Sequence, residues 1–430
     1  MDQDNQIKTD SPAAEREIKP EVTDWLGIGQ FVFSALAALL LLGGSLVSTL
    51  VLLIQASFSE LAVNLGSDLS PYLFAAGMAA AGLLITPSAY YSGRRLFGKT
   101  APRDLNWSRI VWIGYLAPLP LLMGIAAQNG TGWIRVLLPP AHALANTAGV
   151  FLLLDMARRK LPGGNARRFW GAFTSGLGLT PLVTFVLEIF ILIGIALAWT
   201  LLLGAMPGFR QDLLQLASHL QNSSGSPQAI ERAIGRFAAR PGVLFTLFTY
   251  VALLIPIVEE LLKPAAVWLL LKRKLQPWEG FVIGATSGAG YALFENLTIG
   301  AAPEAWTFVT ITRLGTAAVH IFTAGAVGWG LASGFTEKKI FRMITAYLAA
   351  VLIHGVWNGL NILSAVGGFS AVRDRLGPVW TGLADYAPVA LVLLAVGCLG
   401  GILRANSRFR RAIIAGSNSQ REAEWKLSNS

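Results

Sequence analysis

The chain carries two adjacent carboxylates, Glu259 and Glu260, in the middle of an apolar run that begins near Val243 and ends at Lys272. The run is long enough to span a bilayer, and ionisable groups inside a span are costly, so they are candidates for function. Lys263 follows Glu259 by four residues, the favourable spacing for an ion pair on a helix. Glu260 points about 100° away from Glu259 on such a helix. One carboxylate can therefore pair with the lysine while the other faces a different partner.

Pro264 lies directly after this group. Proline has no backbone N–H, and its ring clashes with the carbonyl four residues back, which here belongs to Glu260. The sequence therefore predicts a kink that frees the Glu260 carbonyl inside the membrane. Freed backbone is tolerated at that depth where it is buried in protein or lines a wet cavity.

Three later apolar runs each carry a polar group of their own: Glu295, His320 and His354. A helical rise of 1.5 Å per residue, counted from the polar end of each run, gives roughly 18 Å for Glu260 and His354. The same count gives roughly 22 Å for His320 and roughly 24 Å for Glu295. These depths share the central and outer part of a hydrocarbon core about 30 Å thick. We therefore expect the four side chains to converge on one cavity.

Further polar residues share the same helix faces. Arg313 precedes His320 by seven residues, and Asn358 follows His354 by four. Three glycines in the run that holds Glu295 allow close approach of a neighbouring helix. Each residue also fits a structural role, because a buried histidine is commonly a hydrogen-bonding group and a buried glutamate can pair with Arg313. A structural role is harder to sustain for the whole set, since these runs contain almost no other acidic residues or histidines.

Imidazole and carboxylate ligands suit zinc, and a catalytic zinc keeps one position open for water. A nearby glutamate can then act as general base. A metal-free site, in which a Glu–His pair activates the water directly, fits the same residues. Glu188 lies alone in an earlier apolar run and fits either a structural hydrogen-bonding group or a member of a relay.

Composition gives the class of protein. Of the 430 residues, 54% are hydrophobic and only 13% are charged, whereas soluble domains carry about 25% charged residues. The net charge of +10 does not indicate nucleic acid, because the basic residues form short clusters between apolar runs, as cytoplasmic loops do. The single cysteine, Cys398, excludes a disulfide within the chain and a cysteine metal site.

The apolar runs predict an all-α, polytopic transmembrane helical bundle of about ten spans. Basic links alternate with less basic ones, so the positive-inside rule places both the N and C termini in the cytoplasm. We expect an integral protein of the bacterial cytoplasmic membrane. The predicted spans cover residues 25–55, 71–92, 110–127, 133–156, 173–206, 243–271, 281–301, 306–335, 343–366 and 386–403.

These motifs resemble those of the PrsW-type intramembrane proteases, a family placed with the CAAX-protease and bacteriocin-processing group. Residues 259–263 match the family's Glu-Glu-x-x-Lys motif in full, and Phe294-Glu295 matches its second motif. His320 and His354 fit the later histidine motifs. Ile299 stands in place of the family's tyrosine. Asn358 gives the His-x-x-x-Asn spacing of the CAAX proteases, where the PrsW pattern has an aspartate.

The resemblance implies an intramembrane metalloprotease that hydrolyses a peptide bond of a membrane-associated protein substrate. By this resemblance, Glu259 and Glu260 activate the water. The residues Glu295, His320 and His354 bind a divalent metal, with zinc expected, or orient the water. Asn358 stabilises the oxyanion, which a preorganised donor does well in a dry site. Lys263 and Arg313 support these groups.

The same reasoning divides the chain into regions. The link at 207–242 has leucines at helical spacing and a second segment that starts at Ser226, so we expect two amphipathic surface helices there. The expected regions are a disordered cytoplasmic tail (1–24), a five-span module (25–206), an extracytoplasmic helical link (207–242), a catalytic PrsW-like module (243–366), a loop with the final span (367–404) and a basic cytoplasmic tail (405–430).

Two other classes of function fit intramembrane glutamates and histidines. A proton- or ion-coupled transporter uses such groups as relays, and a proline kink suits its broken helices. That class commonly shows inverted repeats, whereas the polar groups here lie almost entirely in the second half of the chain. A non-catalytic membrane scaffold would use the polar groups only to hold helices together.

Overall fold

The computed structural model describes residues 24–58, 69–98, 104–162, 164–203, 209–222, 240–300, 302–368, 370–373 and 377–428. Within these residues the secondary structure is helical, with no strand, which confirms the predicted all-α bundle. The helices in chain order are α1 (Trp25–Phe58), α2 (Ser70–Leu96), α3 (Trp107–Ile110), α4 (Trp112–Tyr115), α5 (Pro118–Asn129), α6 (Leu138–Arg158), α7 (Ala166–Thr174), α8 (Thr180–Leu203), α9 (Phe209–Asn222), α11 (Pro241–Thr249), α12 (Ile255–Leu262), α13 (Ala265–Leu270), α14 (Pro277–Thr298), α15 (Trp306–Thr336), α16 (Ile340–Gly367), α17 (Ser370–Arg373) and α18 (Pro378–Ser428).

In the described part of the chain, nine helical segments are long and apolar enough to cross a membrane. They correspond to nine of the predicted spans, so the protein is an integral membrane protein. The predicted span at 281–301 forms α14, which is not among these nine. Helix α14 is 22 residues long, and at 1.5 Å per residue it extends about 33 Å. Glycines and polar residues lower the hydropathy of α14. The helix tolerates them because it packs against other helices.

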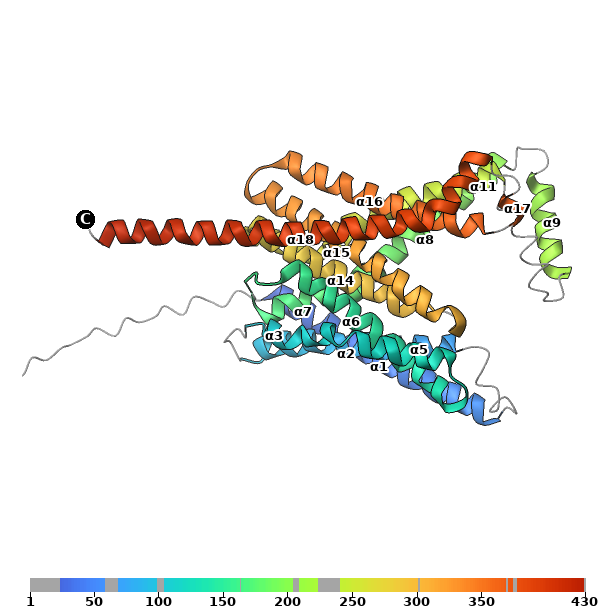
Figure 1. The fold of residues 1–430 in the computed structure, drawn as a ribbon, viewed down its shortest axis with the longest axis horizontal. Coiled ribbons are helices and arrows are strands. Elements are labelled where there is room, and N and C mark those ends of the chain that lie inside the picture. The colour runs from blue at the N-terminus through green and yellow to red at the C-terminus, as the bar shows by residue number, and fades with distance from the viewer. Residues whose placement is uncertain are drawn as a thin grey trace, which may run out of the picture.

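Helix α14 is the central element of the bundle (Figure 1). It packs most extensively against α15 and also contacts α2, α6, α7 and α13. Its start is fixed by Pro277 in the first turn and by Glu279, whose carboxylate accepts a hydrogen bond from the Gln276 backbone N–H (2.9 Å) and pairs with Arg168 of α7 (3.1 Å). Proline at this position removes no intrahelical bond, because the first N–H groups of a helix have no partner. The register of α14 determines where Glu295 lies.

Glycines bring α14 and α15 into backbone contact. A Cβ atom at Gly284 would collide with the carbonyl of Ala324, and one at Gly288 with the carbonyl of His320. Gly328 of α15 faces the carbonyl of Gly280 in the same way. These contacts are the close approach that the sequence predicted for this run. They set the distance between the helix that carries Glu295 and the helix that carries His320.

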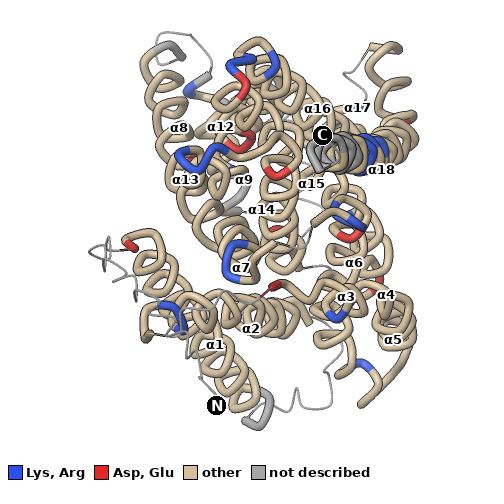
Figure 2. The backbone as a smooth tube through the Cα atoms, turned by 90° about the vertical axis from the view of Figure 1, so that its left-hand side faces the viewer, with Lys and Arg blue, Asp and Glu red and all other residues tan. Residues whose placement is uncertain are grey.

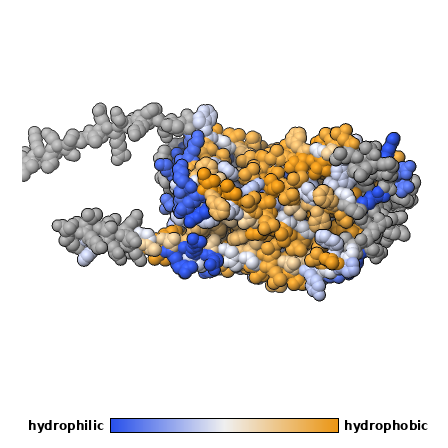
Figure 3. Space-filling view, turned by 90° about the horizontal axis from the view of Figure 1, so that it is seen from above, coloured by the Kyte–Doolittle hydropathy of each residue, from blue (hydrophilic) through white to orange (hydrophobic). Residues whose placement is uncertain are grey.

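The other helices enclose this pair. Helices α1–α6 lie on one side of α14, and α12, α16 and α18 lie on the other (Figure 2). The surface has a hydrophobic belt with hydrophilic residues at both ends, gathered most densely at the end from which α18 projects (Figure 3). Figure 2 shows Lys and Arg segments beside α7 and α13 at this end, and the last described residues of α18 extend beyond it (Figures 1 and 2). We call this end the basic end of the bundle.

The final predicted span and the tail after it form one helix. Helix α18 runs for 51 residues, from Pro378 to Ser428, and projects from the basic end of the bundle (Figure 1). The predicted first amphipathic helix of the 207–242 link is present as α9, at the opposite end from the tip of α18 (Figure 1). The predicted second amphipathic helix, and the predicted disordered tail up to residue 23, lie outside the described residues.

Asp24 anchors the first helix at the basic end. Its carboxylate accepts a hydrogen bond from the Gly27 N–H (3.0 Å) and pairs with Arg167 of α7 (2.8 Å) and Arg95 of α2 (3.0 Å). Partial burial raises the pKa of this carboxyl, but the Gly27 hydrogen bond and the two arginines outweigh it, and the pKa lies below the ordinary 3.8. Three helices therefore meet at one ionised carboxylate.

A pKa lowered by folding stabilises the protein above the pKa of the unfolded state, and this contribution disappears as the pH falls through the folded-state pKa. We therefore expect Asp24→Asn to lower the thermal midpoint at pH 6 and to lower it less at pH 3, below the ordinary pKa of 3.8, where part of this contribution is lost. The effect is small, because partly exposed ion pairs contribute about 1 kcal/mol or less. Thermal unfolding in detergent at both pH values measures it, and an equal effect at pH 3 would contradict the ionic explanation.

Candidate active site

The span that carries the paired glutamates is broken in two places. A π-helical turn, η4 (Tyr250–Leu254), joins α11 to α12, and α12 ends at Leu262. Lys263 and Pro264 form a turn before α13, and Pro264 has φ −81° and ψ 32°. The predicted kink at Pro264 is confirmed. The broken helix presents Glu259, Glu260 and Lys263 within one turn of the break.

The break is stabilised by side chains that bond the carbonyls beside it. The three carbonyls before Pro264 accept hydrogen bonds as follows: Leu261 from Trp268 Nε1 (2.9 Å), Leu262 from Thr180 Oγ1 (3.4 Å) and Lys263 from Ser287 Oγ (2.5 Å). Unpaired backbone groups are costly in a membrane, so these bonds explain how the interrupted helix is tolerated at this depth.

The Lys263 ammonium lies at the centre of the predicted site. Its Nζ is 2.9 Å from Glu259 Oε2 and 2.8 Å from Glu260 Oε1. It also donates to Nδ1 of His320 (2.7 Å) and lies 3.3 Å from Nδ1 of His354. The lysine side chain has no exposed surface, and the other four residues are also buried. The Lys263 cation is therefore paired with two buried carboxylates, and buried charges are costly unless they are paired.

Glu295 reaches the site from α14 and binds a different set of atoms. Its Oε2 is 3.1 Å from His320 Nε2 and 2.7 Å from Arg313 Nη2. Arg313 is itself held by the side chain of Asn296, whose Oδ1 accepts from Nε at 3.0 Å. The structure thus brings all of the predicted polar side chains of α12, α14 and α15 together, including the supporting residues Lys263 and Arg313.

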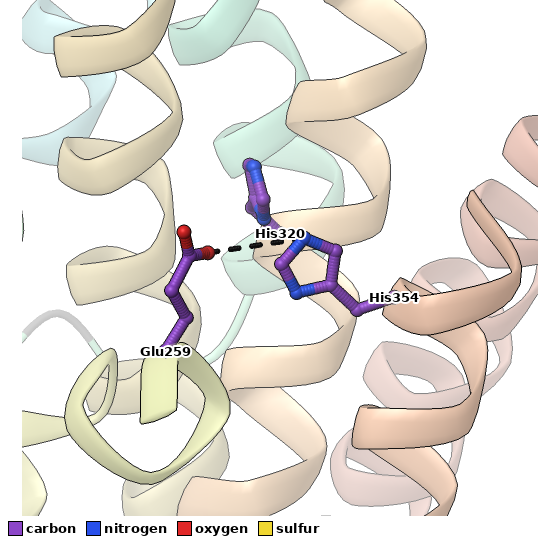
Figure 4. A group of neighbouring side chains, drawn as sticks. All are labelled: Glu259, His320 and His354. Carbon is purple, nitrogen blue, oxygen red and sulfur yellow. Dashed lines mark ion pairs between the residues drawn. The ribbon is translucent and has the colours of Figure 1, made fainter. Parts of the chain in front are cut away.

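Three residues offer donor atoms that converge within 4.8 Å of one another: Glu259, His320 and His354. They come from α12, α15 and α16, and all three are buried (Figure 4). The imidazole rings lie with centroids 5.1 Å apart and nearly perpendicular, and Glu259 Oε2 is 3.8 Å from His354 Nε2. One carboxylate and two imidazoles are ligands of the kind that catalytic zinc sites use, so the donor set fits a divalent metal.

The converging set differs from the predicted metal ligands in one member. Sequence reasoning grouped Glu295 with His320 and His354, whereas Glu259 is the carboxylate whose donor atom lies with both histidines. The Glu295 carboxylate instead pairs with Arg313 and with the outer nitrogen of His320. The adjacent positions 259 and 260 gave no means of deciding which carboxylate faces the histidines.

Asn358 lies on α16, one turn after His354, as predicted. Its amide nitrogen donates to the Val251 carbonyl in the π-helical turn η4, at 2.9 Å. This bond joins α16 to the broken span just before Glu259. In this arrangement the Asn358 amide fixes the helix that carries the glutamates, and a role in stabilising an oxyanion stays a prediction.

Glu188 is a member of the site that the sequence left undecided. It lies on α8, and its carboxyl group is close enough to the Glu259 carboxyl for the two to interact electrostatically. Its own backbone carbonyl accepts from the Tyr250 hydroxyl (3.2 Å), which ties α8 to η4. Its isolation in a strongly apolar run was the signal for it. The sequence did not predict that Glu188 lies near Glu259, because a long link separates α8 from the broken span and the relative position of the two helices does not follow from the sequence.

The fold and the site define a polytopic helical membrane protein with a buried group of carboxylates and histidines on α12, α14, α15 and α16. Residues 196–394 match the model of the PrsW family intramembrane metalloproteases. This region contains the broken span and helices α14, α15 and α16, so the chain is an enzyme of the intramembrane metalloprotease class. No curated protein and no solved structure matches the chain. Glu188 lies just before the matched region.

Proposed function

We propose that this protein is an intramembrane endopeptidase that cleaves a membrane-associated protein substrate with a metal held by Glu259, His320 and His354. The observation that carries this proposal is the convergence of these three buried side chains from three helices. A metal bound there would supply a Lewis acid and an activated water for attack on the peptide carbonyl.

The partners of the two imidazoles support the assignment. His320 Nε2 lies on Glu295, and His354 Nδ1 lies 2.9 Å from Glu260 Oε1. Each ring thus has one nitrogen on a carboxylate. Of the two other nitrogens, His354 Nε2 lies 3.8 Å from Glu259 Oε2, whereas His320 Nδ1 accepts from the Lys263 ammonium and would have to release that bond to bind a metal. Histidines that bind metals generally donate their other ring N–H to a carboxylate or carbonyl, which fixes the ring and raises its basicity. Glu295 and Glu260 would then orient the ligands.

Lys263 would keep Glu259 and Glu260 ionised and would fix the positions of their carboxylates. Its ammonium lies against both carboxylates and the Nδ1 atoms of both histidines. In a metal-free version of the reaction, Glu259 would take the proton of the water beside His354, and the same lysine would support the carboxylate. In both versions water hydrolyses a peptide bond of the substrate, and the two versions differ in whether a metal is bound.

Several finer features belong to the same proposal. The basic end of the bundle would face the cytoplasm by the positive-inside rule, which places both termini there and α9 outside, in a bacterial cytoplasmic membrane. Residues 243–366 would form the catalytic module and residues 25–206 a supporting five-span module. Zinc would be the metal. The His354–Asn358 spacing supports a link to the CAAX-protease group.

Metal analysis tests the proposal most directly. Purified wild-type protein is expected to hold about one zinc per chain, and a His320→Ala/His354→Ala double variant to hold almost none, because two of the three ligands are gone. His142→Ala is the matched control, since His142 is also buried but lies on α6 outside the donor set. Elemental analysis by mass spectrometry gives the metal content, and circular dichroism confirms the fold of each variant.

The outcomes separate the alternatives. Zinc that is lost only in the double variant supports the site. Zinc that the folded double variant retains would overturn the ligand assignment. If the folded wild-type protein contains no metal, the metal-dependent mechanism is wrong, and proton-coupled uptake into liposomes would then separate a carrier from a metal-free protease.

A further inference from the structure

A groove of about 410 Å³ opens at the basic end of the bundle, between α1, α7 and α13. It lies apart from the glutamates and histidines described above, none of which lines it. Its volume falls within the range of ligand sites, about 300–1,000 Å³. We call it the arginine-rimmed groove, after the four arginines in its lining: Arg95, Arg167, Arg168 and Arg273.

One part of the groove is apolar. Its apolar lining comes from Leu26 and Phe33 of α1, from Leu269 and Leu270 of α13, and from Leu179. Leu26 is 43% exposed and Leu269 is 53% exposed. These residues lie on helices that span the membrane, so the apolar part of the groove is continuous with the hydrocarbon region. An acyl chain is the occupant that such a wall favours.

The other part of the groove carries an excess of positive charge. Asp24 pairs with Arg95 and Arg167, and Glu279 pairs with Arg168. Two carboxylates therefore face four arginines. Arg273 is exposed, and among the described residues no ion pair is found for it. Figure 2 shows these basic segments at the ends of α7 and α13, on the face turned toward the viewer.

We propose that the arginine-rimmed groove binds one anionic phospholipid, with its phosphate against the arginines and an acyl chain along the leucine wall. Basic pockets between membrane helices recognise anionic head groups. The planar guanidinium group matches the oxygens of a phosphate with paired hydrogen bonds. A soluble anion would leave the apolar wall exposed, and a zwitterionic lipid would leave the surplus positive charge unbalanced.

The groove shares structural elements with the glutamate–histidine site. Ser175 lines the groove, and its hydroxyl lies 3.2 Å from the Ser287 hydroxyl, which in turn donates to the Lys263 carbonyl. Ala266, three residues after Lys263, also lines the groove. A lipid that rests on α7 and α13 therefore supports the backbone from which the Lys263 side chain projects. Lipid binding itself does not depend on the proposed protease activity.

Two variants test the two parts of the groove. Gly29 of α1 lines the groove and a Cβ there would meet no atom within 4 Å, so Gly29→Phe adds a bulky apolar side chain at a point of the lining where the backbone leaves room for one. Gly43 of the same helix is equally open but lies outside the groove, so Gly43→Phe is its control. Arg273→Glu reverses the charge of Arg273, for which no ion pair is found in the described part of the chain. Its control, Lys272→Glu, makes the same change one residue away, outside the lining.

The measurement is native mass spectrometry of purified full-length protein in mixed detergent micelles that contain phosphatidylglycerol or phosphatidylcholine. Wild-type protein and both controls are expected to retain one phosphatidylglycerol and to prefer it over phosphatidylcholine. Arg273→Glu is expected to lower the affinity for phosphatidylglycerol at least about fivefold, since one basic residue near an anionic lipid contributes about 1 kcal/mol. Gly29→Phe is expected to lower the affinity because its ring occupies space that the acyl chain would fill. The thermal midpoint should rise with phosphatidylglycerol in wild type and less in these variants.

Three results would overturn the proposal. The first is retention of phosphatidylglycerol by both groove variants at the level of their controls. The second is equal retention of phosphatidylcholine by the wild type, which would remove the preference for an anionic lipid. The third is an equal rise in thermal midpoint with water-soluble glycerol phosphate, which would show an anion site without a lipid. If Gly29→Phe fails to fold, Arg273→Glu and its control still decide the outcome.

Discussion

Glu259→Gln and His354→Ala are each expected to abolish peptide-bond hydrolysis while the helical bundle stays folded. Both residues belong to the converging donor set. Under the proposed mechanism, removing either takes away a group that binds the metal or accepts the proton of the water, and general acid–base catalysis alone contributes about 10²–10⁴-fold in rate. Glutamine keeps the size of the Glu259 side chain, so the change is mainly in charge. His354 is buried, but the cavity left by alanine borders a polar site rather than the apolar core.

Cleavage can be measured even though the substrate is unidentified. Membranes of cells that produce each variant are compared for new protein N-termini by mass spectrometry. Glu304→Gln, an exposed acidic residue outside the site, serves as the control and should behave as wild type. Folding is followed by thermal unfolding in detergent. Normal cleavage by both site variants would refute the protease assignment, whereas loss of folding in both would favour a scaffold role for these residues.

Lys263→Met is expected to be the most destabilising single substitution in the site. Methionine fills a similar volume, but Glu259 and Glu260 would lose the cation that both of them contact. Breaking a buried ion pair by removing one partner costs about 3–5 kcal/mol. The expected result is a large fall in the thermal midpoint in detergent, or a shift of unfolding to a much lower concentration of denaturing detergent.

A double variant separates charge from packing in this effect. Lys263→Met/Glu260→Gln removes the lysine together with one of its two carboxylates, so it should be more stable than Lys263→Met alone. Glu260→Gln by itself leaves Glu259 paired and should be milder. Unfolding measured for the wild type, both single variants and the double variant gives the coupling between the two residues. If the double variant is as unstable as the sum of the singles, the lysine contributes through packing rather than through charge.

Most of the fold could be predicted from the sequence, because apolar runs of span length have few alternatives in a membrane. The structure agrees with the predicted bundle and with the break at Pro264, a residue whose backbone chemistry allows little else. Helix α14 was the hardest span to judge from hydropathy, since it is surrounded by protein. Its glycines, which lower its hydropathy, were also the sign that another helix packs closely against it.

The sequence indicated which polar residues lie together, and it gave less information on how they are arranged. Rare polar residues in long apolar runs identified Glu295, His320 and His354, and estimated depth brought them to one level. Depth along a helix gives no information on rotation about its axis. For that reason the sequence did not show that Glu259, rather than Glu295, offers the donor atom that lies within 4.8 Å of a donor atom of each histidine. It also could not place Glu188 beside Glu259, because their helices are separated by the 207–242 link.

The glycine contacts between α14 and α15 have a consequence for the tolerance of this protein to mutation. Gly284 and Gly288 lie against backbone carbonyls of α15, one of them that of His320 itself. Replacing either glycine by alanine or valine makes the span more hydrophobic, so insertion into the membrane would proceed as well as before. The added Cβ atom would nevertheless collide with a backbone carbonyl of α15 and push apart the helices that carry Glu295 and His320. The protein can thus lose the geometry of its candidate active site through changes that make the helix more apolar.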